Sequence, residues 1–150
     1  MEKLHFKIFI EAPAEQVYDM MLSETSYTDW TEAFYPGSYF RGSWKAGEKI
    51  LFLAKDPDGN EGGMVSKIIK AERGQIVSVE HYGVFDNGKE VTSGPEVNSW
   101  AGGLEEYSFE TTSKGTLLKV AMDSNIENKS YFEETWPKAL VKLKNICETK

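Results

Sequence analysis

Apolar and polar residues alternate at the start of the chain, where every second position is apolar: Leu4, Phe6, Ile8 and Ile10. This alternation is typical of a strand with one buried face, so the pattern predicts a strand over Lys3–Glu11. Pro13 follows and is preorganised for the first turn of a helix. The sequence then predicts a helix over Ala14–Leu22 and a second short helix, anchored by Trp30, over Ser23–Ala33.

The middle of the chain alternates between β-prone stretches and turns. Asp56-Pro57-Asp58-Gly59 and Asp86-Asn87-Gly88 are turn sequences, because Pro fixes one φ angle and Gly accepts a positive one. The predicted strands are Gly47–Ala54, Met64–Ala71, Gln75–Phe85, Leu104–Thr112 and Thr116–Ser124. Their regular spacing through short connections predicts an antiparallel meander.

The stretch from Gly88 to Gly103 fits neither a helical nor a strand period. It contains Pro95 and a single tryptophan, Trp100. Long irregular loops of this kind are either functional lids or mobile connections. The sequence leaves both interpretations open.

The last segment has apolar residues at helical spacing: Phe132, Trp136, Leu140, Leu143 and Cys147. Ser130 and Glu133 match a capping box, which predicts that the helix begins there. Pro137 is compatible with a kink in this helix or with the first turn of a shorter one. Burial of five such side chains contributes about 10 kcal/mol, which does not offset the roughly 30 kcal/mol needed to order about 20 residues. The helix must therefore pack on a large apolar surface, and the concave face of the sheet is the candidate.

Strand parity assigns side chains to the two faces of the predicted sheet. The outward set, expected to face water, is Ser78, Glu80, Glu106, Ser108, Glu110, Lys119 and Asp123. The inward set is Val77, Val79, His81, Glu105, Tyr107, Phe109, Leu118, Val120 and Met122. The inward set is mostly apolar with a few polar groups, which is typical of a small-molecule pocket, although a filled core with hydrogen-bonded polar groups is the alternative.

Composition and charge narrow the possible partners. The 150 residues, 40% hydrophobic and 27% charged, are as expected for one globular domain over residues 1–150. The formal net charge of −7 repels phosphate, so we predict no nucleic-acid partner. One of the longest apolar runs, Ile50–Ala54, is far too short to span a bilayer, so no membrane insertion is expected. A single cysteine and no signal-peptide pattern predict a cytoplasmic protein.

The sequence offers little catalytic chemistry. One cysteine and two distant histidines do not supply a zinc site, so no metal and no cofactor are predicted. Cys147 lies on the apolar face of the helix, where a thiolate is disfavoured. If Glu105 and His81 share a cavity, burial would perturb both and they could move a proton on a bound ligand. The alternative places Glu105 at a strand end in water, and we assign no catalytic residue.

Several stretches, in order, resemble the START-like (SRPBCC, helix-grip) superfamily, and in particular the branch named for the activator of heat-shock protein 90 ATPase. The similar segments are Ile10–Tyr18, Trp30, the strand start around Gly47, Gly62-Gly63, Gly115–Val120 and Trp136–Lys144. The resemblance spans nearly the whole chain. It implies an α+β helix-grip fold, with a curved antiparallel sheet of about seven strands around a long C-terminal helix and two short helices after the first strand.

The resemblance also implies a partner. Members of the superfamily commonly carry lipids, sterols, polyketides or other apolar molecules between helix and sheet. We therefore predict a small hydrophobic ligand, held by a set of residues drawn from the inner face, the loop and the helix: Met64, Val79, His81, Trp100, Tyr107, Phe109, Val120, Met122, Trp136 and Leu140. The alternatives are an interaction module for a chaperone in the stress response, with Trp44 or Trp100 on the surface, and a cyclase- or dehydratase-like enzyme. The expected oligomeric state is a monomer or weak dimer.

Overall fold

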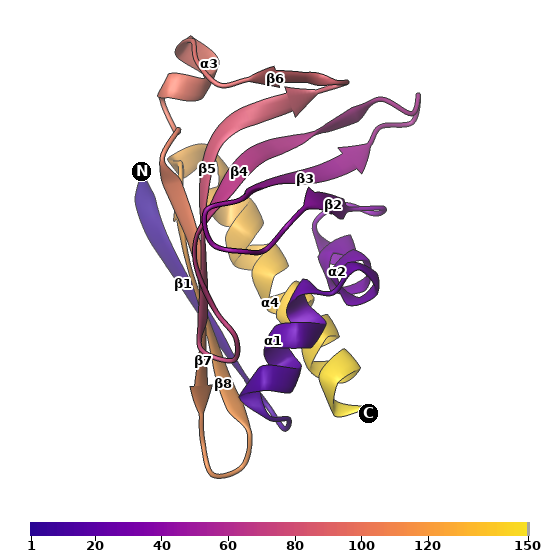
Figure 1. Cartoon of the computed structure of the whole chain (residues 1–150), viewed down its shortest axis with the longest axis vertical. Helices are drawn as coiled ribbons and strands as arrows, with labels where there is room; N and C mark the ends of the chain where they lie inside the picture. The colour runs from indigo at the N-terminus through magenta and orange to yellow at the C-terminus, as the bar shows by residue number, and fades with distance from the viewer. Residues whose placement is uncertain (150) are drawn as a thin grey trace.

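A strongly curved antiparallel sheet holds the long C-terminal helix against its concave face (Figure 1). The computed structural model describes residues 1–149. The strands are β1 (Glu2–Ile10), β2 (Tyr39–Gly42), β3 (Lys49–Lys55), β4 (Glu61–Glu72), β5 (Ile76–Asp86), β6 (Lys89–Val91), β7 (Gly103–Thr111) and β8 (Thr116–Ser124). The helices are α1 (Ala14–Leu22), α2 (Glu24–Trp30), the 3-10 helix η1 (Thr31–Ala33), α3 (Pro95–Asn98) and α4 (Ile126–Glu148).

The strands follow the order β1-β8-β7-β5-β4-β3-β2, and every pairing is antiparallel. The strand β5 pairs with β7 through its first half and with the short β6 near its end. The β4–β5 ladder contains two register shifts, between Val65 and Ser66 and between Ile68 and Lys70. Bulges of this kind bend a strand and increase its twist, which fits the curvature of the sheet around α4.

The predicted α+β helix-grip fold is confirmed, with eight strands among residues 1–149 in place of about seven. The additional elements β2, β6 and α3 are short. The strand β2 spans four residues and β6 three, too few to display a period of two. The predicted irregular stretch from Gly88 to Gly103 contains both β6 and α3.

Helix α4 begins earlier than the sequence predicts. Asn125 caps the helix, because its side-chain oxygen accepts the backbone N–H of Asn128 at 3.0 Å. The predicted capping box at Ser130 is wrong, since Ser130 already lies inside the helix. The first turn escaped prediction because it buries no apolar residue, and Ile126 is 81% exposed. Pro137 lies well inside the helix on its exposed side, so it does not mark the first turn.

The inward face predicted by parity is found in the core. Seven of its residues are buried together with side chains of α4: Val77, Val79, Tyr107, Phe109, Leu118, Val120 and Met122. Two outward predictions are wrong. Asp123 lines a cavity on the concave side of the sheet, and Ser78 is 5% exposed rather than facing water. Its neighbours across the two adjacent strands are Lys70 and Glu106, and such long side chains on the same face leave little room for water around the short serine.

The short helices α1 and α2 pack beside α4, as Figure 1 shows. Trp30 anchors α2 as predicted, because it is 1% exposed and its Nε1 donates to the carbonyl oxygen of Met21 at 3.0 Å. In the part of the chain that the structure describes, no helix is both long and apolar enough to cross a membrane.

Candidate functional site: a cavity between sheet and helix

A cavity of about 540 Å³ lies between the concave face of the sheet, helix α2 and the N-terminal half of α4. Its floor comes from β4, β5, β7 and β8, and its walls come from α2, η1 and α4. It meets solvent near Met1 and Asn128, two lining residues that are exposed. Two other hollows, of about 450 and 610 Å³, are more open and lie toward the surface.

Aromatic side chains dominate the walls. Eight of the lining residues are aromatic: Tyr27, Trp30, Phe34, Phe52, Trp100, Tyr107, Phe132 and Trp136. The Trp136 ring is central to this set. Its centroid lies 4.9 Å from that of Phe34 and 5.9 Å from those of Trp30 and Tyr107. These separations are typical of favourable aromatic pairs, so Trp136, Phe34, Trp30 and Tyr107 pack as one aromatic cluster.

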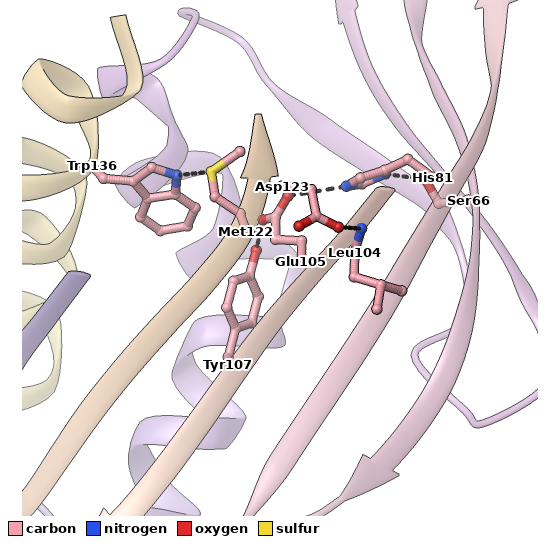
Figure 2. Close-up of polar contacts among 8 residues, drawn as sticks. All are labelled: Ser66, His81, Leu104, Glu105, Tyr107, Met122, Asp123 and Trp136. Carbon is pink, nitrogen blue, oxygen red and sulfur yellow. Dashed lines mark hydrogen bonds and ion pairs between the residues drawn. The ribbon is translucent and has the colours of Figure 1, made fainter. Parts of the chain in front are cut away.

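A polar cluster lies on the floor of the cavity, on three adjacent strands (Figure 2). The Oε1 atom of Glu105 on β7 is 3.0 Å from Nε2 of His81 on β5. The Nδ1 atom of His81 is 2.6 Å from Oγ of Ser66 on β4. The second carboxylate oxygen, Oε2 of Glu105, accepts the hydroxyl of Tyr107. The four groups therefore form one hydrogen-bonded chain across the sheet.

The hydrogen bonds favour an ionised Glu105. Burial raises the pKa of its carboxyl, but the hydrogen bond from His81, the attraction between these two groups and the hydrogen bond from Tyr107 lower it below its ordinary value. Hydrogen bonds donated to a carboxylate favour its charged form. The negative charge of Glu105 in turn disfavours ionisation of the neighbouring phenols. Burial, and secondarily Glu105, raise the pKa of Tyr27 and Tyr107.

A second carboxylate, Asp123, lines the cavity close to its opening. Its Oδ2 accepts the backbone N–H of Leu104 at 2.9 Å, and its Oδ1 lies 3.2 Å from Nζ of Lys3. Burial raises the pKa of Asp123, but these contacts and the nearby chain amino terminus lower it overall. Positive groups of the protein therefore balance the charge of Asp123.

The chain Ser66–His81–Glu105 brings together the residue types of a nucleophilic triad, but its serine cannot act on a cavity ligand. Ser66 is fully buried at 0% exposure and does not line the cavity. Cys147 lies far along α4, where burial, and secondarily Glu148, raise the pKa of its thiol to about 11. Among residues 1–149, no group of three or more histidine, cysteine, aspartate or glutamate side chains is placed to hold a metal ion.

The structure divides the predicted ligand-binding residues into two groups. Six line the cavity: Met64, His81, Trp100, Tyr107, Met122 and Trp136. The other four are packed in the core and do not reach it: Val79, Phe109, Val120 and Leu140. Parity gives the face of a sheet but not the position along it, so it does not separate these groups.

One residue of the site was misplaced in one of the two sequence-based alternatives, and several others were missed. Glu105 does not lie at a strand end in water, because its side chain is 19% exposed and doubly hydrogen-bonded. The aromatic residues Tyr27, Phe34 and Phe52 were not predicted to line the site. A concentration of aromatic residues between Tyr27 and Tyr35 was the available signal.

The two tryptophans that would mark a protein-interaction surface are both partly buried. Trp100 lies on the loop after α3, where its Nε1 donates to the carbonyl oxygen of Glu96 at 2.7 Å. Trp44 packs against Tyr27, Phe40 and Phe52 and does not itself line the cavity. Its Nε1 is buried and has no hydrogen-bond partner among the described residues.

A curved sheet, a long gripped helix and a cavity between them define the helix-grip class of the START-like superfamily. The chain belongs to the family described as activator of Hsp90 ATPase homolog 1-like protein, whose model matches residues 11–148. Family and fold together support a module that binds a ligand or acts in the manner of an Hsp90 activator. No curated protein matches the chain.

Solved structures from several bacteria share the fold. The Aha1 dimer from Colwellia psychrerythraea has a TM-score of 0.71 at 18% identity, with 99% of this chain and 97% of that chain covered. An AHSA1-like protein from Aeromonas hydrophila gives 0.72 at 14% identity, covering 99% and 93%. A protein from Nitrosomonas europaea gives 0.73 at 14% identity, covering 98% and 94%. At these identities the likeness establishes the fold alone.

Proposed function

We propose that this protein binds a small, largely apolar molecule in the cavity between its sheet and helix α4, without transforming it. The observation that carries the proposal is the cavity of about 540 Å³ with its eight aromatic lining residues. Ligand sites in proteins have volumes of about 300–1,000 Å³, with mostly apolar walls and a few polar groups. The polar cluster around Glu105 supplies those polar groups.

The apolar lining of the cavity gives the proposal an energetic basis. The cavity meets solvent near Met1 and Asn128, so a molecule that enters it removes apolar surface from water. Each Å² of apolar surface removed contributes about 25 cal/mol. A ligand that binds only the folded protein also makes the protein more stable when loaded.

Filling the cavity with a side chain tests the proposal. Met64 on β4 lines the cavity, so Met64→Trp adds an indole where the ligand would lie. Ile69 is on the same strand and is 46% exposed, which makes Ile69→Trp the matched control. The wild-type protein and both variants, purified from the protein's own host, are examined by native mass spectrometry for a retained small molecule and by thermal shift with fatty acids, sterols and flavonoids.

We expect the wild type and Ile69→Trp to retain a ligand, and Met64→Trp to lose it while staying folded. Equal ligand retention by both tryptophan variants would place binding elsewhere. Absence of any ligand from the wild type, in both measurements, would refute the proposed function.

A protein partner is the second candidate, because the matching family is described by its likeness to an activator of the Hsp90 ATPase. The test is the ATPase rate of the Hsp90 from the same host with and without this protein. A rate increase that Met64→Trp leaves intact would separate this role from ligand binding.

A further inference from the structure

The carboxylate of Glu105 lines the cavity and keeps unused capacity to accept hydrogen bonds. An ionised carboxylate has roughly four acceptor positions. Within residues 1–149, one side-chain donor reaches each oxygen, His81 at Oε1 and Tyr107 at Oε2. The count is the same for a neutral and a protonated His81, because Nε2 is the donor to Glu105 in both cases. Glu105 can therefore accept further hydrogen bonds from a molecule in the cavity.

The hydroxyl of Tyr27 is a donor without an acceptor in the described part of the chain. Tyr27 lines the cavity and is 8% exposed, and its hydroxyl forms no hydrogen bond with residues 1–149. Its ring centroid lies 6.1 Å from that of Phe52, which in turn lies 5.9 Å from the ring of His81. Burial, and secondarily the charge of Glu105, raise the pKa of Tyr27, so the phenol is within electrostatic reach of the polar cluster.

The other donors beside these two groups are already engaged. Both ring nitrogens of His81 are hydrogen-bonded, and the Tyr107 hydroxyl donates to Glu105. The indole Nε1 of Trp136 donates to the sulfur of Met122 at 3.0 Å, as Figure 2 shows. The lining that residues 1–149 provide contains neither lysine nor arginine. A further donor for Glu105 therefore has to come from the molecule that occupies the cavity.

A hydroxyl group complements both unused groups. It donates through its hydrogen and accepts at its oxygen, so it can pair with a carboxylate and with a phenol. Hydrogen bonds to an ionised acceptor are roughly twice as strong as those between neutral groups. A carboxylate ligand has no donor and carries the same charge as Glu105, and a hydrocarbon has neither donor nor acceptor. Sites that hydrogen-bond a hydroxyl reject analogues that lack it, because the polar groups of the site are then left unpaired.

We infer that the ligand of the cavity is an uncharged, hydroxylated apolar molecule, an alcohol or a phenol, whose hydroxyl donates to Glu105 while Tyr27 donates to a ligand oxygen. This inference rests on the proposed function and specifies its ligand class. It disfavours fatty-acid carboxylates, which the proposed function alone allows.

Three probes that share one apolar body test the inference: para-tert-butylphenol, para-tert-butyltoluene and para-tert-butylbenzoate. They differ in carrying a hydroxyl, a methyl or a carboxylate group. Binding is measured at pH 7, where the phenol is neutral, by ¹H–¹⁵N NMR of the indole groups of Trp30 and Trp136, which line the cavity. We expect wild-type protein to bind the phenol about tenfold more tightly than the toluene, and the benzoate most weakly.

Two variants test the two polar groups separately. Glu105→Gln replaces the ionised acceptor with a neutral amide of the same shape, so the preference for the phenol over the toluene should fall close to unity. Tyr27→Phe removes the hydroxyl alone and should weaken binding of the phenol severalfold without changing that of the toluene. The matched controls are Glu106→Gln, on the opposite face of β7, and Tyr18→Phe, on α1 and outside the cavity lining. Both controls should keep the wild-type preference.

Each contrary result overturns a defined part of the inference. If the wild type binds the toluene or the benzoate as tightly as the phenol, the ligand class is wrong although the proposed function stands. If Glu105→Gln keeps the preference, Glu105 is not the acceptor, and unchanged phenol binding by Tyr27→Phe would exclude Tyr27 as the donor. If no probe shifts the indole signals, the inference fails, while ligand retention in native mass spectrometry still decides the proposed function. The wild-type comparison decides the ligand class even if a variant does not fold.

Discussion

The carboxylate of Glu105 and the imidazole of His81 are joined at 3.0 Å across β7 and β5, on the floor of an aromatic cavity. This pair couples the stability of the fold to pH. The folded-state pKa of Glu105 lies below its ordinary 4.5, so the folded protein favours the ionised form. Ionised Glu105 therefore contributes stability above pH 4.5, and that contribution is lost as the pH falls through the lowered value.

The first prediction follows from this linkage. Wild-type protein should be more stable than Glu105→Gln at pH 7, and the difference should shrink as the pH falls below about 4.5. Urea unfolding followed by circular dichroism at a series of pH values measures the difference. Glu106→Gln serves as the reference on the opposite face of β7. A gap that stays constant down to pH 3 would show that the charge of Glu105 does not contribute.

The second prediction concerns the start of α4. Asn125→Ala removes the side chain that accepts the Asn128 N–H and should cost about 1 kcal/mol of unfolding free energy. Ser130→Ala should cost almost nothing, because Ser130 is an exposed residue inside the helix, where alanine has the higher propensity. Chemical denaturation of both variants measures which one loses more unfolding free energy. A larger loss in Ser130→Ala would support the capping box that the sequence predicts.

The third prediction compares two tryptophans. Trp44→Phe removes a buried N–H that has no partner among the described residues, so the change should be nearly neutral or stabilising. Trp30→Phe removes the hydrogen bond to Met21 and leaves a buried carbonyl group with one partner fewer, which should cost about 1–3 kcal/mol. Thermal unfolding measures both variants. Equal destabilisation would mean that ring packing, and not the indole N–H, sets the cost.

The fourth prediction concerns the glycine pair at the start of β4. A Cβ atom at Gly63 would lie 1.8 Å from the carbonyl oxygen of Phe52, so the two strands could not stay paired in this register. A Cβ atom at Gly62 would meet its nearest neighbour, the Phe85 carbonyl oxygen, at 3.9 Å. Gly63→Ala should lose more than about 3 kcal/mol or fail to fold, whereas Gly62→Ala should stay within about 1 kcal/mol. Expression yield and unfolding midpoints distinguish the two.

The sequence predicts the fold well because its long elements carry clear periods. The alternation from Leu4 to Ile10 and the helical spacing from Trp136 to Cys147 each bury one face, and burial is what these patterns record. The start of α4 was missed for the same reason. Its first turn buries nothing, so only the cap at Asn125 marks it, and an asparagine alone is a weak signal in a sequence.

The site was less predictable than the fold. Parity places Val79 and His81 on the same face, but only His81 reaches the cavity. The difference depends on where helix α4 crosses each strand. That position is set by tertiary packing and not by the local sequence pattern. The partnership of Glu105 with Tyr107 was likewise hidden, because a strand places residues two apart side by side without showing that their side chains meet.

The first strand, β1, contacts the last strand and the last helix of the fold, and these contacts constrain how the protein folds during its synthesis. The strand β1 pairs along its whole length with β8, and Lys144 Nζ donates to the carbonyl oxygen of Phe9 at 2.9 Å. Near the last turn of α4, Oε2 of Glu148 accepts the backbone N–H of Glu11 at 2.8 Å. At about 5–20 residues per second, the first strand waits roughly 10 s on the ribosome for its partner to be synthesised. Its apolar face stays uncovered until β8 and α4 have been synthesised, and an unpaired apolar strand of this kind is prone to aggregate.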